Sequence, residues 1–139
     1  MTTSVTPVLH RSRDAVEPAL RAAVDRLDPT TRALSAYHLG WTEADGTPRD
    51  SGGGKALRPA LVLLGARACG GTEADAVPSA VAVELVHNFS LVHDDLMDGD
   101  TERRHRATVW AVWGSANAIL TGDAMVGLCL LYTSPSPRD

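Results

Sequence analysis

The sequence predicts an all-α fold. Alanine is abundant among the 139 residues, and aromatic residues make up only 4% of them. This composition favours closely packed helices over sheets. Apolar residues recur at helical spacing between breaks rich in Gly and Pro. A chain of this length forms at most one domain, although it can bury a real core.

Two helices are predicted before the first long loop. Residues 1–9 are a polar lead that we expect to be disordered. Residues 10–27 carry apolar side chains along one face, as an amphipathic helix does, and Pro18 fits best near its first turn. A second, shorter helix is predicted over residues 31–39, after the break at Asp28-Pro29.

A loop rich in turn residues, 42–54, ends in consecutive glycines and leads into a helix over 59–69. Glycine lets the backbone approach a ligand closely, and Pro59 suits the first position of that helix. Lys55 and Arg58 add charge at the helix N-terminus, which is already positive. The stretch therefore predicts an anion site of the kind that binds phosphate. The alternative is a flexible loop with two solvated cations.

The central helix, predicted over 72–98, is apolar along most of its length but ends in three carboxylates. Asp94 and Asp98 are four residues apart, so they share one face about 6 Å apart along the axis, with Asp95 on the flank. Three like charges repel one another and the negative end of the helix dipole unless a cation is present. Clustered carboxylates without a soft ligand favour Mg²⁺. The alternative is a solvated acidic helix end.

His87 lies two turns before Asp94, about 10 Å down the axis on the same side. A histidine in this position is usually a core residue whose hydrogen bonds are satisfied. Gly99 can end the central helix, and a basic stretch, 102–106, follows. Two more helices are predicted beyond it, at 108–114 and 116–131.

Charge and composition narrow the classes of function. The net charge is −4, with 13 basic and 17 acidic residues, so we expect no binding to nucleic acid or to an anionic membrane surface. We find no apolar run that we expect to span a bilayer, and predict a cytoplasmic chain without a transmembrane segment. Cys69 and Cys129 are predicted to be small core residues in a reducing compartment.

Three motifs, in order, resemble the N-terminal motifs of the trans-type isoprenyl diphosphate synthases, the polyprenyl synthetase family. They are GGGKALRP, ELVHNFSLVHDDLMD and DTERRHRATVW. The resemblance covers about 10–131 and implies an antiparallel helical bundle of the isoprenoid synthase type, of which only the N-terminal part is present. Family members continue with more helix and a second aspartate-rich motif. We therefore expect that 132–139 is a tail foreign to the fold, that the chain alone is inactive, and that the full-length form is a homodimer.

The resemblance also implies a reaction, the condensation of isopentenyl diphosphate with an allylic diphosphate. Mg²⁺ held by Asp94 and Asp98, with Asp95 in support, would neutralise the leaving diphosphate. Arg103 would pair with the allylic diphosphate. A further set of side chains would hold the isopentenyl diphosphate: Lys55, Arg58, His87 and Arg104.

Product length in the family depends on an apolar well beneath the acids. Ser90 lies under Asp94 on the same stripe, and its side chain is too small to block chain growth. Phe89 is rotated off that stripe, so its role as a floor comes only from the family pattern. The combination resembles short-chain synthases of the geranylgeranyl type. The alternative for Phe89 is an ordinary core residue.

Two other functions remain open from the sequence. A class I terpene cyclase also ionises an allylic diphosphate with an aspartate-rich helix, but it needs no second diphosphate site, so GGGKALRP and the Arg103-Arg104 pair count against it. A non-catalytic partner subunit of a synthase would have a similar half-bundle without the second acidic motif.

Overall fold

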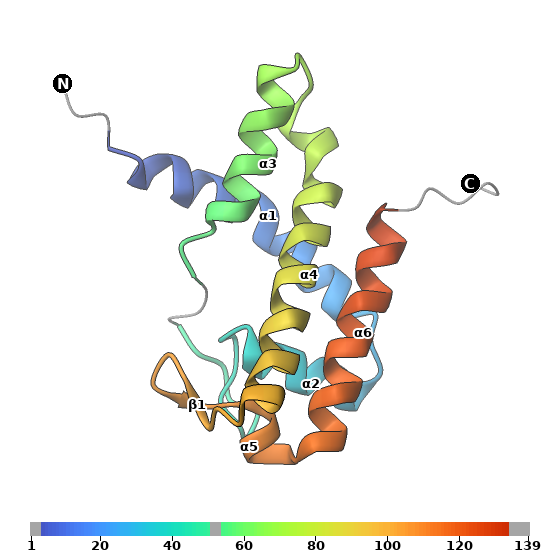
Figure 1. Cartoon of the computed structure of the whole chain (residues 1–139). Coiled ribbons are helices and arrows are strands. Elements are labelled where there is room, and N and C mark those ends of the chain that lie inside the picture. The colour runs from blue at the N-terminus through green and yellow to red at the C-terminus, as the bar shows by residue number, and fades with distance from the viewer. Residues whose placement is uncertain (1–3, 51–53, 134–139) are drawn as a thin grey trace.

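A computed structural model of the protein describes residues 4–50 and 54–133. Within these residues the regular elements are helices, apart from one short hairpin and an isolated β-bridge between Thr42 and Pro48 (Figure 1). The predicted all-α class is confirmed. Residues 1–3, Gly52 and Gly53 of the predicted anion loop, and 134–139 of the predicted tail lie outside the described residues. The elements are α1 (Thr6–Val24), α2 (Pro29–His38), α3 (Leu57–Ala68), α4 (Glu73–Asp98), β1 (Glu102–Arg103), β2 (Arg106–Ala107), α5 (Val109–Trp113) and α6 (Ser115–Thr133).

The long helix α4 forms the centre of the fold, as Figure 1 shows. It makes its most extensive contacts with α6, then with α3, while α1 packs across both α3 and α4. Leu85 and Val92 of α4, Leu63 of α3 and Met125 of α6 are almost completely buried and belong to one core cluster. Because α4 packs on both sides, its C-terminal end is fixed relative to α3 and to the hairpin. This arrangement positions the residues of the candidate site.

The N-terminal helix differs from the prediction in two respects. It begins at Thr6, so residues 6–9 are helical and not part of a disordered lead. Pro18 lies inside α1 and not in its first turn. α2 begins at Pro29, because the Asp28 carboxylate accepts hydrogen bonds from the backbone N–H groups of Thr30 and Thr31 and so caps the helix. The Thr31 hydroxyl also donates to this carboxylate, and this bond, together with the backbone bonds, lowers the pKa of Asp28.

Helix α3 begins two residues earlier than predicted. Ala56 precedes it in the left-handed conformation, with φ of 54°, and this places Pro59 at the third helical position instead of the first. At its other end, Gly70 adopts φ of 84° and the Gly71 N–H donates to the Ala66 carbonyl. The prediction that both cysteines are core residues is half right, since Cys129 is buried and Cys69 is exposed.

Helix α6 corrects one expectation about membranes. Ser115–Thr133 is long and apolar enough to cross a bilayer by length and composition, contrary to the expectation that no segment would be. Core helices of soluble proteins pass the same test, so the finding is weak evidence for a span. One third of the segment is buried inside the fold, mainly against α4. The helix also continues to Thr133, two residues beyond its predicted end.

Candidate functional site

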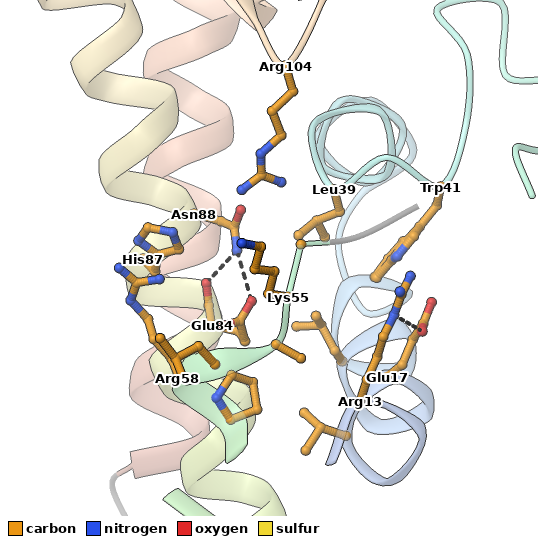
Figure 2. A pocket seen from close by; sticks show the side chains of 16 residues that line it. Arg13, Glu17, Leu39, Trp41, Lys55, Arg58, Glu84, His87, Asn88 and Arg104 are labelled. Atoms are coloured by element: carbon orange, nitrogen blue, oxygen red, sulfur yellow. Dashed lines mark hydrogen bonds and ion pairs between the residues drawn. The ribbon is translucent and has the colours of Figure 1, made fainter. Parts of the chain in front are cut away.

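A cavity of about 510 Å³ lies between α1, the start of α3, α4 and the hairpin turn (Figure 2). Four side chains predicted to bind one ligand meet in its lining: Lys55, Arg58, His87 and Arg104. Among the described residues, no carboxylate lies within ion-pair distance of Lys55, Arg58 or Arg104. The cavity therefore gathers positive charge that is available to an anion.

A strained hairpin turn carries Arg104 to this cavity. Strands β1 and β2 pair antiparallel with Arg103 opposite Arg106, so the turn consists of Arg104 and His105 alone. Both have positive φ, 52° and 64°, as two-residue hairpin turns with the correct twist require. Such a conformation costs about 1–3 kcal/mol for each residue other than glycine. The guanidinium lies beside Gly54, where a Cβ would be in ordinary contact, 3.4 Å from Arg104 Nη2.

Arg106 fixes the hairpin to the rest of the fold. Its Nη1 donates to the Tyr37 carbonyl (2.8 Å) and its Nη2 to the Thr42 carbonyl (2.7 Å). The guanidinium also lies 4.0 Å from the centroid of the Tyr37 ring, and the Tyr37 hydroxyl donates to the Ala107 carbonyl (2.6 Å). Sequence reasoning assigned Arg106 no role, because its contacts involve residues more than 60 positions away that no local pattern reveals.

The three carboxylates at the end of α4 do not share one environment. Asp95 is 2% exposed and accepts hydrogen bonds from Arg103, whose Nε lies 3.0 Å from Oδ2 and whose Nη2 lies 2.8 Å from Oδ1. Asp94 and Asp98 are exposed. The bond to Asp95 raises the pKa of Arg103. Thus the structure pairs one acid with the hairpin and leaves two on the outer face.

These two exposed carboxylates limit what metal the site can take. Within the part of the chain that the structure describes, no group of three or more His, Cys, Asp or Glu residues is arranged to hold a metal. Asp94 and Asp98 supply oxygen donors from one helix face. That set fits Mg²⁺, which commonly binds one or two carboxylates and completes its shell with water and phosphate oxygens.

A chain of polar side chains runs from Glu84 and Asn88, which line the cavity, to His38, which lines a neighbouring pocket. His38 Nε2 lies 3.0 Å from Asn88 Oδ1, and Asn88 Nδ2 donates to the Glu84 carbonyl at 2.8 Å. Burial lowers the pKa of His38 to about 4, so the ring is neutral and Nε2 carries the proton that it donates to Asn88. Burial, followed by the charges of Arg58 and Arg104, also lowers the pKa of His87. Sequence reasoning assigned no role to His38, Asn88 or Glu84, although Glu84 and Asn88 lie within the second motif.

The comparison with protein families shows which family this chain belongs to. A family model described as polyprenyl synthetase matches residues 50–136, more than half of the chain. The chain belongs to the polyprenyl synthetase family. This confirms the family resemblance of the three motifs.

Relatives of known name agree with this assignment. The chain is 56% identical to the (2E,6E)-farnesyl diphosphate synthase of Mycobacterium tuberculosis over 140 aligned positions, which are 99% of this chain and 39% of that protein. It is 49% identical to the geranylgeranyl diphosphate synthase of the same organism, over 85% of this chain and 34% of that protein. The crystal structure of a polyprenyl synthetase from Streptomyces coelicolor A3(2) superposes with a TM-score of 0.89 at 57% identity, covering 93% of this chain and 38% of that one. The chain thus spans less than two fifths of the length of these relatives.

Phe89 and Ser90, the two residues that the family resemblance linked to product length, make different contacts on α4. The Phe89 ring meets the His93 ring edge-on, with centroids 5.6 Å apart, and packs against the core. Ser90 Oγ donates to the His87 carbonyl. His93 Nε2 lies 3.1 Å from the Ile119 carbonyl and directly over Gly122 of α6.

Proposed function

We propose that the whole protein is a Mg²⁺-dependent trans-prenyltransferase that condenses isopentenyl diphosphate with an allylic diphosphate. The observation that carries the proposal is the cavity that collects Lys55, Arg58, His87 and Arg104 beside the aspartate-rich end of α4. One anionic group bound there and a second at the aspartates would bring two substrates together. Family membership and the names of the relatives support the same reaction.

The cavity suits the isopentenyl diphosphate. Arg58 lies in the first turn of α3, so the positive end of the helix dipole adds to its charge. Lys55 and Arg104 donate N–H groups with full charge, and bidentate contact is available to the guanidinium. His87, neutral because its pKa is lowered, can donate one N–H without adding to the repulsion among the cations. Holding the diphosphate in this way orients the alkene and removes entropy from the reaction barrier.

The allylic diphosphate is assigned to the exposed acids. Asp94 and Asp98 would hold Mg²⁺, which supplies charge neutralisation for a leaving diphosphate. Arg103, kept in place by Asp95, can direct its remaining N–H groups toward the same oxygens. The C–O bond of the allylic substrate breaks with its electron pair leaving on diphosphate. The isopentenyl alkene then forms the new C–C bond and a proton is lost from the isopentenyl unit.

The finer parts of the proposal concern product, assembly and location. We assign short-chain products, because matched relatives are named for farnesyl and geranylgeranyl diphosphates and only Phe89 offers an aromatic floor five residues before Asp94. The full-length protein is proposed to be a cytoplasmic homodimer, consistent with substrates that carry highly charged, water-soluble head groups. Because the chain spans about 39% of its relatives' length, we expect turnover to need the remaining part.

The experiment compares the chain alone with a chimaera. In the chimaera, residues 1–133 replace the corresponding segment of the Streptomyces coelicolor polyprenyl synthetase. Each is incubated with Mg²⁺ and geranyl diphosphate, with and without isopentenyl diphosphate, and products are analysed by chain length. We expect elongation by the chimaera that requires isopentenyl diphosphate, and none by the chain alone. Cyclised products formed without isopentenyl diphosphate would instead support a terpene cyclase, and an inactive chimaera that still associates with an intact synthase would support a non-catalytic partner.

A further inference from the structure

We infer that Glu84 is a counter-charge within the cation cavity, the cavity lined by Lys55, Arg58, His87 and Arg104. Its carboxylate weakens the binding of a diphosphate in this cavity enough for the diphosphate to leave after each reaction. The inference rests on the proposed function and concerns a residue to which neither the three motifs nor the comparisons assign a role. It makes Glu84 a determinant of ligand affinity and exchange and not a group that reacts.

The geometry places a carboxylate where an anion site would be expected to have none. Glu84 lines the cavity on the same helix as His87, one turn away, and its side chain is only partly exposed. Figure 2 shows it beneath Lys55 and beside Arg58. Asn88 Nδ2 lies 3.5 Å from Glu84 Oε2 as well as 2.8 Å from the Glu84 carbonyl. His38 holds the other end of the Asn88 amide, so the wall that faces Glu84 is fixed.

The carboxylate influences the cavity as a charge and not as the partner of one cation. No ion pair involving Glu84 occurs among residues 4–50 and 54–133. Burial raises the pKa of Glu84, and this rise is opposed by the Arg58 charge, the Asn88 hydrogen bond and the Arg104 charge, so the carboxylate interacts with both guanidinium groups. Inside a partly dehydrated cavity such interactions are stronger than in water. Glu84 therefore offsets part of the positive potential that a bound diphosphate would feel.

The reaction explains why a weaker hold is useful. The isopentenyl diphosphate keeps its own diphosphate through the condensation, so the new product still occupies the cation cavity when the bond has formed. That group must leave before another isopentenyl diphosphate binds. Without Glu84, the charges of Lys55, Arg58 and Arg104 and the N-terminus of α3 would hold it tightly and slow each round. A fixed carboxylate beside them shortens the residence time.

The test uses the 139-residue chain, because the residues that carry the argument lie within it. Dissociation constants and dissociation rates for inorganic diphosphate and isopentenyl diphosphate are measured for the wild type, Glu84→Gln and Glu84→Ala. Gln keeps the shape and an oxygen acceptor for Asn88, whereas Ala removes both. We expect both variants to bind about tenfold more tightly, mainly through slower dissociation.

The matched control is Glu73→Gln, which changes the net charge equally. Glu73 begins α4 and lies about 16 Å from Glu84 along the axis, beyond the screening length of about 8 Å at physiological ionic strength. The Glu73→Gln variant should bind both ligands with the affinity of the wild type. Urea unfolding of every variant checks that the fold is kept, and a merely structural role for Glu84 would weaken binding in Glu84→Ala, not tighten it.

The outcomes separate the inference from the proposed function. Tighter binding in both Glu84 variants, with no change in the control, supports the counter-charge. If the wild type binds as tightly as the Glu84 variants, or more tightly, the inference is overturned and the proposed function still stands. A wild-type chain that binds neither ligand would overturn the inference together with the assignment of the cavity.

Discussion

Arg103 and Asp95 join the hairpin to the acidic end of α4. The guanidinium donates from Nε to both carboxylate oxygens and from Nη2 to Oδ1, and the carboxylate is almost completely buried. This pair decides which of the three acids faces outward. With Asp95 turned inward, the outer face of the helix end consists of Asp94 and Asp98.

Breaking this pair should be costly for the fold. Arg103→Ala leaves the Asp95 carboxylate buried without its partner, and we expect the free energy of unfolding to fall by about 3 kcal/mol or more. The exposed Arg67–Glu73 pair provides the control, since Arg67→Ala should cost less than about 1 kcal/mol. Urea denaturation of the chain measures both. Equal losses would show that the Asp95 pair is no more important than a surface ion pair.

Gly122 should be required for packing, because His93 of α4 lies against it. A Cβ at this position would lie 2.2 Å from His93 Nε2, and His93 is packed against Phe89. Gly122→Ala should therefore destabilise the chain by about 1–3 kcal/mol through overpacking. Gly127 of the same helix has open space at its Cβ, so Gly127→Ala should stabilise by up to about 1 kcal/mol. Thermal unfolding of the two variants compares them, and destabilisation of the same size in both would contradict the packing argument.

In the strained hairpin turn, substitution of an exposed residue by glycine should stabilise the protein. His105 has φ of 64° and a fully exposed side chain, so His105→Gly relieves strain without removing a buried contact. We expect a gain of about 1 kcal/mol in the free energy of unfolding. His10→Gly is the control, because His10 is exposed within α1, where glycine should destabilise by up to about 1 kcal/mol. Loss of stability in His105→Gly would show that the turn is not strained.

The titration of His38 should make the stability of the fold depend on pH. Its pKa is lowered from 6.5 to about 4 by burial, so the unfolded chain takes up a proton first as the pH falls. Stability from this group is complete above pH 6.5 and is lost as the pH falls toward 4, by about 3 kcal/mol in total. His38→Gln keeps an N–H donor for Asn88 but cannot titrate. The difference in unfolding free energy between wild type and His38→Gln should therefore change over this range, and a constant difference would contradict the assignment.

Local patterns were sufficient to predict the helices, but not the hairpin or the starts of α1 and α3. Helical periodicity and turn residues predicted α4 to within one residue, since Thr72 caps it and Gly99 ends it in the left-handed conformation. The spacing of His87 and Asp94 placed both on one side of this helix. Lys55, Arg58 and Arg104 were assigned to one ligand through the family resemblance, and the fold brings them to one cavity with His87.

The remaining features depend on backbone conformation at single residues or on contacts between distant segments. The start of α3 was placed at Pro59 because proline favours the first turn, but Ala56 adopts a left-handed conformation that begins the helix earlier. The different environments of Asp95 and its neighbours depend on where the hairpin places Arg103. The His38–Asn88 bond joins residues 50 positions apart, so no local pattern could predict it.

The most direct test of the cation cavity is a calorimetric titration of isopentenyl diphosphate into the 139-residue chain and its Arg104→Ala and Arg67→Ala variants. Each charged hydrogen bond is worth about 1.5–3 kcal/mol, so loss of Arg104 should weaken binding by at least about tenfold. Arg67 lies on α3 outside the cavity, and its variant should bind as the wild type does. Equal affinity in the wild type and Arg104→Ala would contradict the account.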